Sequence, residues 1–300
     1  MSEKKPSRRQ VRKLERAVAP RKERGRLRVA LRLLAKHPLE AAWLLMLVVF
    51  ALVGPYLTHQ DPYAVRVASR FEDASVTHFL GTDEYGRDVF TRLVYGTRIV
   101  FYVILLCGFL SAGLGTIVGL VAGYFGKAPD LLLSRIVDAV QAFPPILIGI
   151  MLAAAVRPSL DTAILATALF ATPELARVVR GEVLRIREEA YVEASRAVGA
   201  SHLHIIVRGI LPNVLPAIIV QTSSSAPRAV IAVAGLSFLG LGAQPPIPDW
   251  GAMVYQANSY MYEHPLYLIA VTVALSVTVI ILNLLGDTVR DLLARKQARF

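Results

Sequence analysis

The sequence predicts an all-α integral membrane protein with six transmembrane helices and a basic N-terminal tail. Composition is the first observation: 55% of the 300 residues are hydrophobic and only 18% are charged. The second is the number and length of the apolar runs, which exceed what the buried helices of a soluble domain need. The third is charge placement, because Lys and Arg gather in the segments between those runs.

The basic tail spans residues 1–36 and accounts for the whole formal net charge of +11. It holds 14 Lys or Arg against three acidic residues. Because it directly precedes the first apolar run, we expect a cytoplasmic segment that contacts anionic lipid, rather than one that binds nucleic acid. It is too long for the basic region of a signal peptide, and no small-residue cleavage site follows.

The apolar runs divide the remaining chain into three parts. Residues 37–98 hold the first span, at about 39–57, and an external segment in which 86–98 has the apolar and charged faces of an interfacial helix. Residues 99–290 form a core of five spans, and residues 291–300 are a C-terminal segment. The core spans lie at about 99–124, 131–156, 160–179, 214–239 and 266–285.

Orientation follows from the positive charges of the connections. The tail, the six arginines within 177–208 and the basic C-terminus fall on one side, which is predicted to be the cytoplasm. The connection 241–263 has no Lys or Arg and falls outside. Six crossings place both termini in the cytoplasm, in agreement with all of these positions.

The connection at 185–212 is predicted to be a docking element for another protein. Ala190, Ala194 and Ala197 follow helical spacing, Gly199 is a typical helix terminator, and a second short helix begins at Ser201. Small side chains allow close approach, and a rigid helix between two membrane helices transmits motion. The alternative is an ordinary connecting loop, although such loops are usually shorter.

Ionisable residues inside apolar runs indicate a polar path or a partner. Arg135 and Asp138 share a helix face and are expected to pair, whereas Glu174 and Arg177 are expected at the membrane interface. Arg228 looks unpaired in the fifth run. It is expected either to line a path and contact a substrate carboxylate, or to pair with an acid of a partner subunit.

Further residues are candidates for the same path or its outer gate. Gln221 and Ser224 belong to a polar run one to two turns before Arg228. Gln244, Pro245 and Trp250 belong to a stretch with three prolines in seven residues, which cannot form a helix interior. We expect this stretch to cap the mouth of the path, with Trp250 at the membrane interface.

Signals for catalysis are missing, so the chain is not expected to be an enzyme. The stretch Gly123–Lys127 lacks the spacing of a phosphate-binding GxxxxGK[ST] loop, and energy must therefore come from a partner. His202 and His204 have no third ligand nearby, so neither a metal nor another cofactor is expected. Cys107 is a lone cysteine in an apolar run and is expected to be a buried hydrophobe.

Four segments together resemble ABC importer permeases of the dipeptide, oligopeptide and nickel class. Gly81 to Asp88 resembles the GTDxxGRD segment of that class. Glu193-Ala194-Ser195, Gly199 and Leu211-Pro212 resemble its EAA loop, with Ser195 in place of an Ala. The stretches 236–251 and 283–291 resemble its gate region and its C-terminal end. The tail before residue 30 lies outside the resemblance.

The resemblance implies a MetI-like type I importer fold in a prokaryotic cytoplasmic (inner) membrane. It implies a second homologous permease subunit, an extracytoplasmic substrate-binding protein and two ATPase subunits that bind ATP and Mg. The loop residues that would couple to the ATPases are Glu189, Glu193, Ala194, Ser195, Gly199, Leu211 and Pro212. Peptides are the expected substrates, with nickel chelates or glutathione-like molecules as alternatives.

One rival class is a secondary transporter driven by an ion gradient. It predicts discontinuous helices and a coupling acid at mid-membrane, and it leaves the connection 185–212 unexplained.

Overall fold

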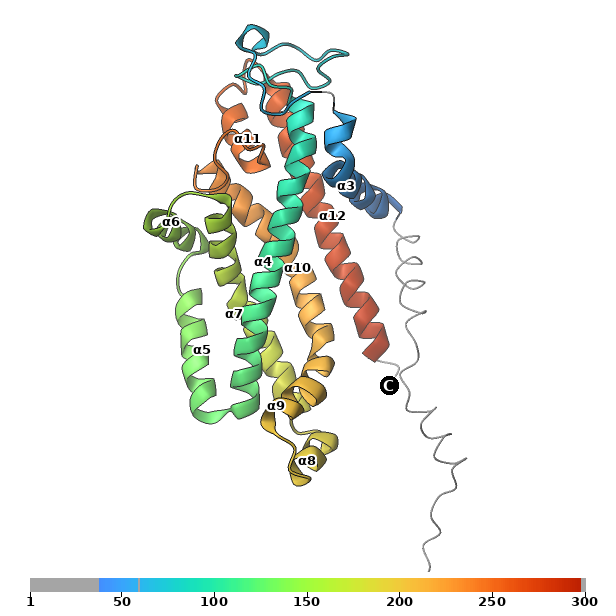
Figure 1. Ribbon diagram of the computed structural model, residues 1–300, viewed down its shortest axis with the longest axis vertical. Coiled ribbons are helices and arrows are strands. Elements are labelled where there is room, and N and C mark those ends of the chain that lie inside the picture. The colour runs from blue at the N-terminus through green and yellow to red at the C-terminus, as the bar shows by residue number, and fades with distance from the viewer. Residues whose placement is uncertain (1–37, 59, 298–300) are drawn as a thin grey trace, which may run out of the picture. The chain divides into compact units, whose positions relative to one another are not determined.

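The computed structural model describes residues 38–58 and 60–297, and the regular elements of these residues are all helical (Figure 1). The helices are α3 (Pro38–Leu57), α4 (Val89–Phe125), α5 (Lys127–Gln141), α6 (Pro145–Ala155), α7 (Leu160–Ile186), α8 (Ala190–Ala197), α9 (His202–His204), α10 (Leu211–Phe238), α11 (Trp250–Asn258) and α12 (Pro265–Gln297), with a short 3-10 turn at Val67–Ser69. The predicted basic tail lies outside the described residues and stays a prediction.

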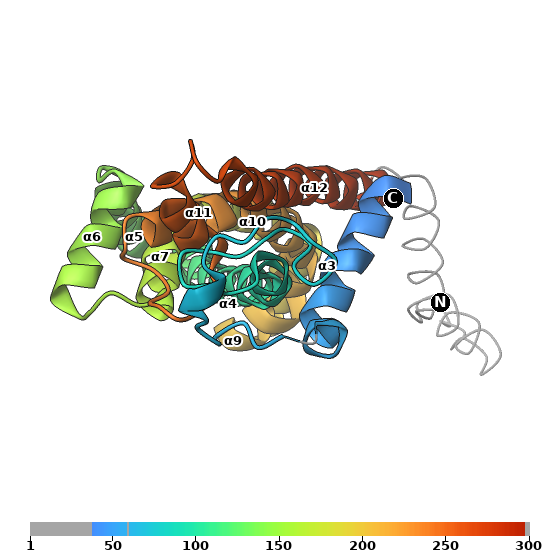
Figure 2. The same cartoon turned by 90° about the horizontal axis from the view of Figure 1, so that it is seen from above.

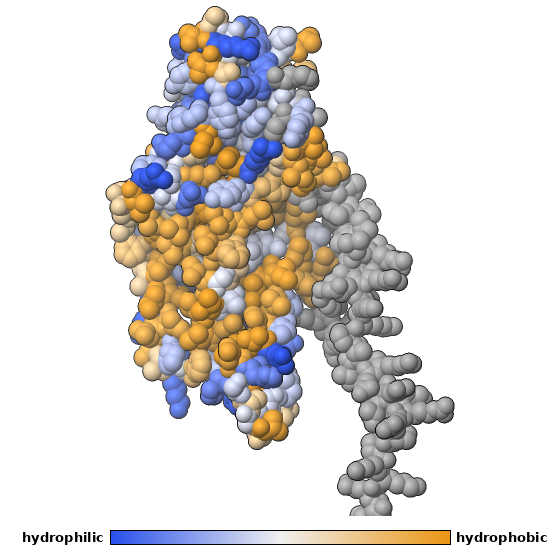
Figure 3. Space-filling model, in the orientation of Figure 1, coloured by the Kyte–Doolittle hydropathy of each residue, from blue (hydrophilic) through white to orange (hydrophobic). Residues whose placement is uncertain are grey.

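The predicted fold class is confirmed, whereas the number of spans is only approximately six. Four helices are long and apolar enough to cross a membrane: α4, α7, the stretch His202–Phe238 and α12. The helices α5 and α6 together give at most one further span. The helix α3 has 20 residues, and the apolar stretch found among its described side chains, Leu45–Gly54, is shorter than a full span. Figure 3 shows apolar surface around the middle of the helices and polar surface toward both ends.

The third predicted span is broken rather than continuous. The helices α5 and α6 meet at an angle of 90°. Phe143 and Pro144 occupy the break, and Pro145 opens α6. A proline ring clashes with the preceding turn and lacks an N–H, so two consecutive prolines end one helix and start the next in a new direction. A hydropathy value averaged over a window of residues does not register a change of chain direction, so hydropathy predicts the two helices as one span.

The predicted interfacial helix at 86–98 is wrong. Asp88 caps α4 by accepting a hydrogen bond from the Thr91 backbone N–H, and α4 then continues without a break to Phe125. Val89 and Val94 are buried, and so is Arg92. Both faces of these turns are therefore covered by protein, and their mixture of apolar and charged residues does not reflect a bilayer surface.

The remaining spans begin or end differently from the apolar runs. The helix α7 continues to Ile186 and α12 to Gln297, because polar residues extend these helices beyond the apolar stretch. The helical path into the fifth span begins before its apolar run. A π-helical segment, Ile205–Ile210, joins α9 to α10 directly, and its wider turn accommodates Pro212 in the first turn of α10.

The centre of the bundle is the contact between α4 and α7, which lie side by side (Figure 2). Gly115, Gly119 and Gly123 recur every fourth residue on α4 and face α7. A Cβ atom added at Gly119 would lie 2.6 Å from Cβ of Val179 and 2.7 Å from the carbonyl oxygen of Ala176. Small residues at this spacing let two membrane helices approach closely, where hydrophobicity alone does not hold them together.

Replacing Gly119 with valine should separate α4 from α7. Overpacking of this kind costs about 1–3 kcal/mol, so we expect a lower unfolding temperature for the Gly119→Val protein in detergent. Gly113→Val is the matched control on the same helix, because no atom lies within 4 Å of a Cβ added there. An equal loss of stability in both variants would contradict the close contact.

Candidate functional site

The connection between α7 and α10 is a rigid, projecting element. Its helix α8 is held by Val192, which is fully buried against Ile205 and Ile210. Gly199 ends the helix with a positive φ of 78°, a conformation that residues with a Cβ adopt at a cost. Its backbone N–H donates to the Arg196 carbonyl at 3.0 Å. Ser201 then caps the next helical turn.

Polar contacts tie this connection to the membrane helices. The Tyr191 hydroxyl donates to the carbonyl of Gly209 at 3.2 Å, and Arg187 donates to the carbonyl of Gly123 on α4 at 2.9 Å. The Tyr124 hydroxyl lies 2.8 Å from Nδ1 of His202. These contacts therefore join the connection to α4 and to the π-helical segment that leads into α10.

The structure adds two apolar residues to the predicted docking face. Glu193 and Ala194 are exposed, as docking requires, whereas Ser195 is half-buried and its hydroxyl donates to the Tyr191 carbonyl at 2.7 Å. Val198 and Leu203 are the most exposed large apolar side chains of the connection, at 83% and 72%. They flank the turn at Gly199, and Figure 3 shows apolar surface at this tip.

The other residues predicted for the docking element flank it. Glu189 occupies the N-cap position of α8, but its side chain makes no capping hydrogen bond. Leu211 and Pro212 form the first turn of α10, where Leu211 is half-buried and Pro212 is exposed. Sequence reasoning missed Val198 and Leu203 as docking residues. Their signal was a large apolar side chain on each side of a turn glycine in an otherwise polar connection.

The proline-rich stretch at 244–250 is attached to α4. Trp250 is the first residue of α11 and is only 3% exposed, so its ring packs against protein instead of facing lipid headgroups, and its position at the membrane interface stays a prediction. Its indole N–H donates to the carbonyl of Leu93 at 3.1 Å. Gly96 makes room for the ring, because a Cβ there would lie 2.3 Å from the indole nitrogen.

Two further contacts hold this outer loop. Arg92 of α4 donates to the carbonyl of Pro246 at 3.3 Å and to that of Pro62 at 3.0 Å. The Gln244 amide donates to the carbonyls of Gly240 and Gly242. The peptide bond between Pro245 and Pro246 is cis. The loop is therefore fixed to α4 and to the end of α10.

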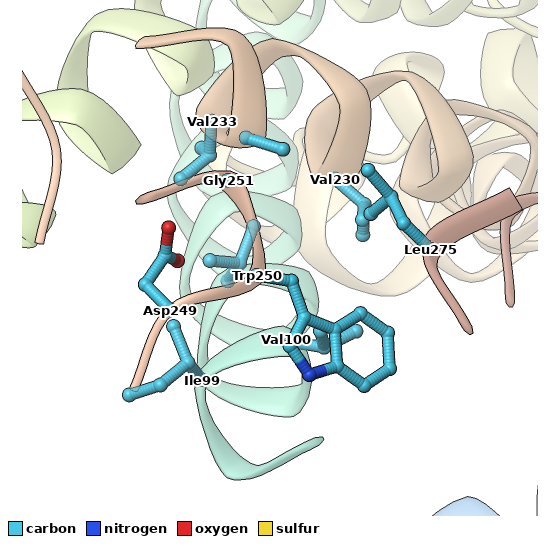
Figure 4. A pocket seen from close by; sticks show the side chains of 10 residues that line it. Ile99, Val100, Val230, Val233, Asp249, Trp250, Gly251 and Leu275 are labelled. Atoms are coloured by element: carbon cyan, nitrogen blue, oxygen red, sulfur yellow. The ribbon is translucent and has the colours of Figure 1, made fainter. Parts of the chain in front are cut away.

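A small apolar cavity lies beside Trp250 (Figure 4). Its lining is hydrocarbon from α4, α10 and α12, apart from Asp249 and the indole nitrogen. Asp249 caps α11 by accepting a hydrogen bond from the Ala252 backbone N–H at 3.0 Å. Burial raises the pKa of the Asp249 carboxyl, and the backbone hydrogen bonds oppose the shift only in part.

The GTDxxGRD segment folds around one buried carboxylate. Asp83 is fully buried and accepts two backbone N–H bonds at 2.9 Å, from Tyr85 and Arg87. The Arg87 guanidinium donates to it at 2.7 Å. Gly86 is required by its positive φ of 71° and by the Arg66 backbone, which occupies the space of a Cβ. The motif therefore builds the external segment that precedes α4.

Two predicted charge arrangements are corrected. Arg228 is not unpaired, because it lies 2.7 Å from Glu174 of α7 in its own chain. Asp138 pairs with Arg177 at 2.9 Å instead of with Arg135. Both acids find arginines on a neighbouring helix, which sequence spacing along one helix does not reveal.

The remaining path candidates have different surroundings. Ser224 lies where α10 passes Gly286 of α12, with 3.3 Å between its Cα and a Cβ added at the glycine. The Ser224 hydroxyl is buried and has no hydrogen-bond partner in the described residues. Gln221 is half-buried. Within the described residues, neither Gln221 nor Ser224 forms a hydrogen bond or an ion pair with Arg228 or Glu174. The described part of the chain also holds no cluster of three potential metal ligands.

Comparison with known proteins places these features in a family. Residues 115–299 match the family described as binding-protein-dependent transport system inner membrane component. The dipeptide transport system permease protein DppC of Alkalihalophilus pseudofirmus is 37% identical over 287 residues, which cover 93% of this chain and 91% of the relative. The glutathione transport system permease protein GsiD of Pectobacterium atrosepticum is 39% identical over 268 residues, covering 88% and 89%.

A solved structure agrees with this family. A structure of the MetNI methionine ABC transporter in an inward-facing conformation contains a chain that is 25% identical. The match covers 67% of this chain and 95% of that one, with a TM-score of 0.54.

The buried cap of α11 generates a pH-dependent prediction. Asp249→Asn keeps a capping oxygen but carries no charge. Asp249→Ala loses the cap, which lowers the free energy of unfolding by about 1 kcal/mol. Because the folded protein raises the Asp249 pKa, wild type loses stability relative to Asp249→Asn as pH rises above the ordinary Asp value of about 4. Thermal unfolding followed by tryptophan fluorescence measures the difference. A stability difference between wild type and Asp249→Asn that stays the same between pH 4 and pH 8 would contradict it.

Proposed function

Since the chain belongs to the family of binding-protein-dependent transport system inner membrane components, we propose that it is the permease subunit of an ATP-driven peptide importer. It moves di- or oligopeptides across a prokaryotic cytoplasmic membrane, with both termini in the cytoplasm. The observation that carries this proposal is the projecting α8 connection, which is rigidly attached to the membrane helices and has an apolar tip.

Peptide is the substrate best supported by the relatives. The similar proteins include permeases named for dipeptide and for glutathione, which is itself a small peptide. A glutathione-like substrate is therefore the first alternative, and nickel chelates remain an alternative without a supporting feature. The broken pair α5–α6 is a feature that a secondary transporter also shows, but family membership favours the ATP-driven class.

The α8 connection is the proposed contact with the ATPase subunits. Val198 and Leu203 would enter an apolar groove, while Glu193 lies on the exposed side of α8. This chain and a second homologous permease would each contribute one α8 connection. The complex therefore has room for two ATPases, one at each connection. ATP and Mg belong to the ATPases.

Motion at α8 has a defined route into the membrane. Arg187 links the connection to Gly123 of α4, and Tyr191 links it to Gly209 before α10. When ATP binding draws the ATPases together, α8 moves with them, and the attached spans change from inward to outward access. Each ligand binds one of the two states, with inward or with outward access, more tightly than the other, and this difference in affinity drives the change. The extracytoplasmic binding protein would dock at the opposite end, near α11.

A charge at the apolar tip should separate the permease from its ATPases. Val198→Asp places a carboxylate in the proposed groove, so we expect at least a tenfold loss of peptide-stimulated ATP hydrolysis by the reconstituted complex. Val76→Asp is the matched control for assembly with the ATPases, because Val76 is a similarly exposed valine in the segment that precedes α4.

Co-purification of the ATPases with each variant gives a second measurement. Loss of the ATPases in Val198→Asp alone supports docking at this tip. Normal assembly and normal hydrolysis in Val198→Asp would exclude it.

A further inference from the structure

The ion pair between Glu174 and Arg228 joins two helices that are long and apolar enough to cross a membrane, and it is open on one side. Glu174 lies in the middle of α7, and Arg228 lies in the second half of α10. Nη2 of Arg228 lies 2.7 Å from Oε2 of Glu174, yet the two side chains are 56% and 45% exposed. Charged groups facing hydrocarbon are costly, so this side of the pair faces water or another protein.

On α7 and on α10, the helix face that carries the charged residue has an unoccupied position two turns further along the chain. Gly235 follows Arg228 by seven residues and Gly181 follows Glu174 by seven, which places each glycine on the same face as the charged residue. No atom lies within 4 Å of a Cβ added at either glycine. Because α7 and α10 carry the chain in opposite directions, the two open positions lie on opposite sides of the pair. This arrangement fits a continuous path more closely than a packed interface.

Neighbouring charges do not compete for the pair. Arg177 is bound to Asp138, and Arg180 donates two hydrogen bonds to Asp130. Within the described residues, Glu174 and Arg228 therefore have only each other as ionic partners. The pair is neutral as a whole but presents a separated negative and positive group toward the open side.

From this geometry we propose that Glu174 and Arg228 form a binding site for a zwitterionic peptide in transit. This inference rests on the proposed peptide importer. Arg228 receives the α-carboxylate of the peptide, and Glu174 receives its α-ammonium group. Binding exchanges one internal ion pair for two ion pairs with the peptide, so both charges keep a partner in either state. Such an exchange allows entry without trapping the substrate, as transport requires.

The test compares two paired neutralisations in the whole complex. Glu174→Gln/Arg228→Gln removes the proposed site without leaving a lone charge that would disturb folding. Asp138→Asn/Arg177→Gln is the matched control, because that pair joins neighbouring helices with similar exposure and a similar distance, 2.9 Å. Complexes with their binding protein are reconstituted in vesicles, and labelled dialanine uptake is measured per ATP hydrolysed.

We expect dialanine uptake per ATP to fall at least tenfold in the Glu174/Arg228 double variant and to stay within twofold of wild type in the control. Equal uptake per ATP in the double variant and wild type would overturn the proposal. Equal losses in both double variants would also overturn it, because they would assign the pair a structural role. ATP-coupled uptake by wild type of a substrate other than peptide would overturn the peptide function and this site together.

Single variants test the assignment of each charge. Arg228→Gln leaves the carboxylate of Glu174, and Glu174→Gln leaves the guanidinium of Arg228. Against wild type, the uptake ratio of Ala-Lys to Ala-Glu should rise in Arg228→Gln and fall in Glu174→Gln, by threefold or more. The binding protein is the same throughout, so a change in this ratio reports on the permease. An unchanged ratio in both assembled complexes contradicts direct contact with the peptide.

Discussion

The close approach of α4 and α7 is the constraint on which the other contacts of the bundle depend. Three glycines at every fourth position of α4 remove the side chains that would separate the two helices. In a bilayer, packing of this kind replaces the hydrophobic driving force of a soluble core. With α7 fixed against α4, Glu174 is placed opposite Arg228, and the α8 connection emerges beside Gly123.

Three acids of α5 and α7 each find an arginine on a neighbouring helix. Asp130 and Asp138 tie α5 to α7, and Glu174 ties α7 to α10. At the outer end, Asp83 is neutralised by Arg87 inside the external segment. The low dielectric of these surroundings makes an unpaired charge costly, so the pattern of pairing also fixes which helices are neighbours.

Hydropathy was enough to predict the fold class and the approximate position of each span, because a bilayer selects long apolar runs. It could not predict the break at Pro144, since a window average does not register a change of direction. It also assigned 86–98 to the membrane surface, although Asp88 caps a helix that continues to Phe125. The motif residues of the α8 connection were recognisable from sequence. The Glu174–Arg228 pair was not, because its partners are 54 residues apart.

The helix α4 contacts a functional element at each end. Near its start, Leu93 and Arg92 hold the outer loop through Trp250 and Pro246. Near its end, Gly123 holds the α8 connection through Arg187. A tilt of α4 about its middle would move the contacts at its two ends in opposite directions. Such a geometry disfavours simultaneous opening at both faces, which protects the ion gradients across the membrane from leakage during transport.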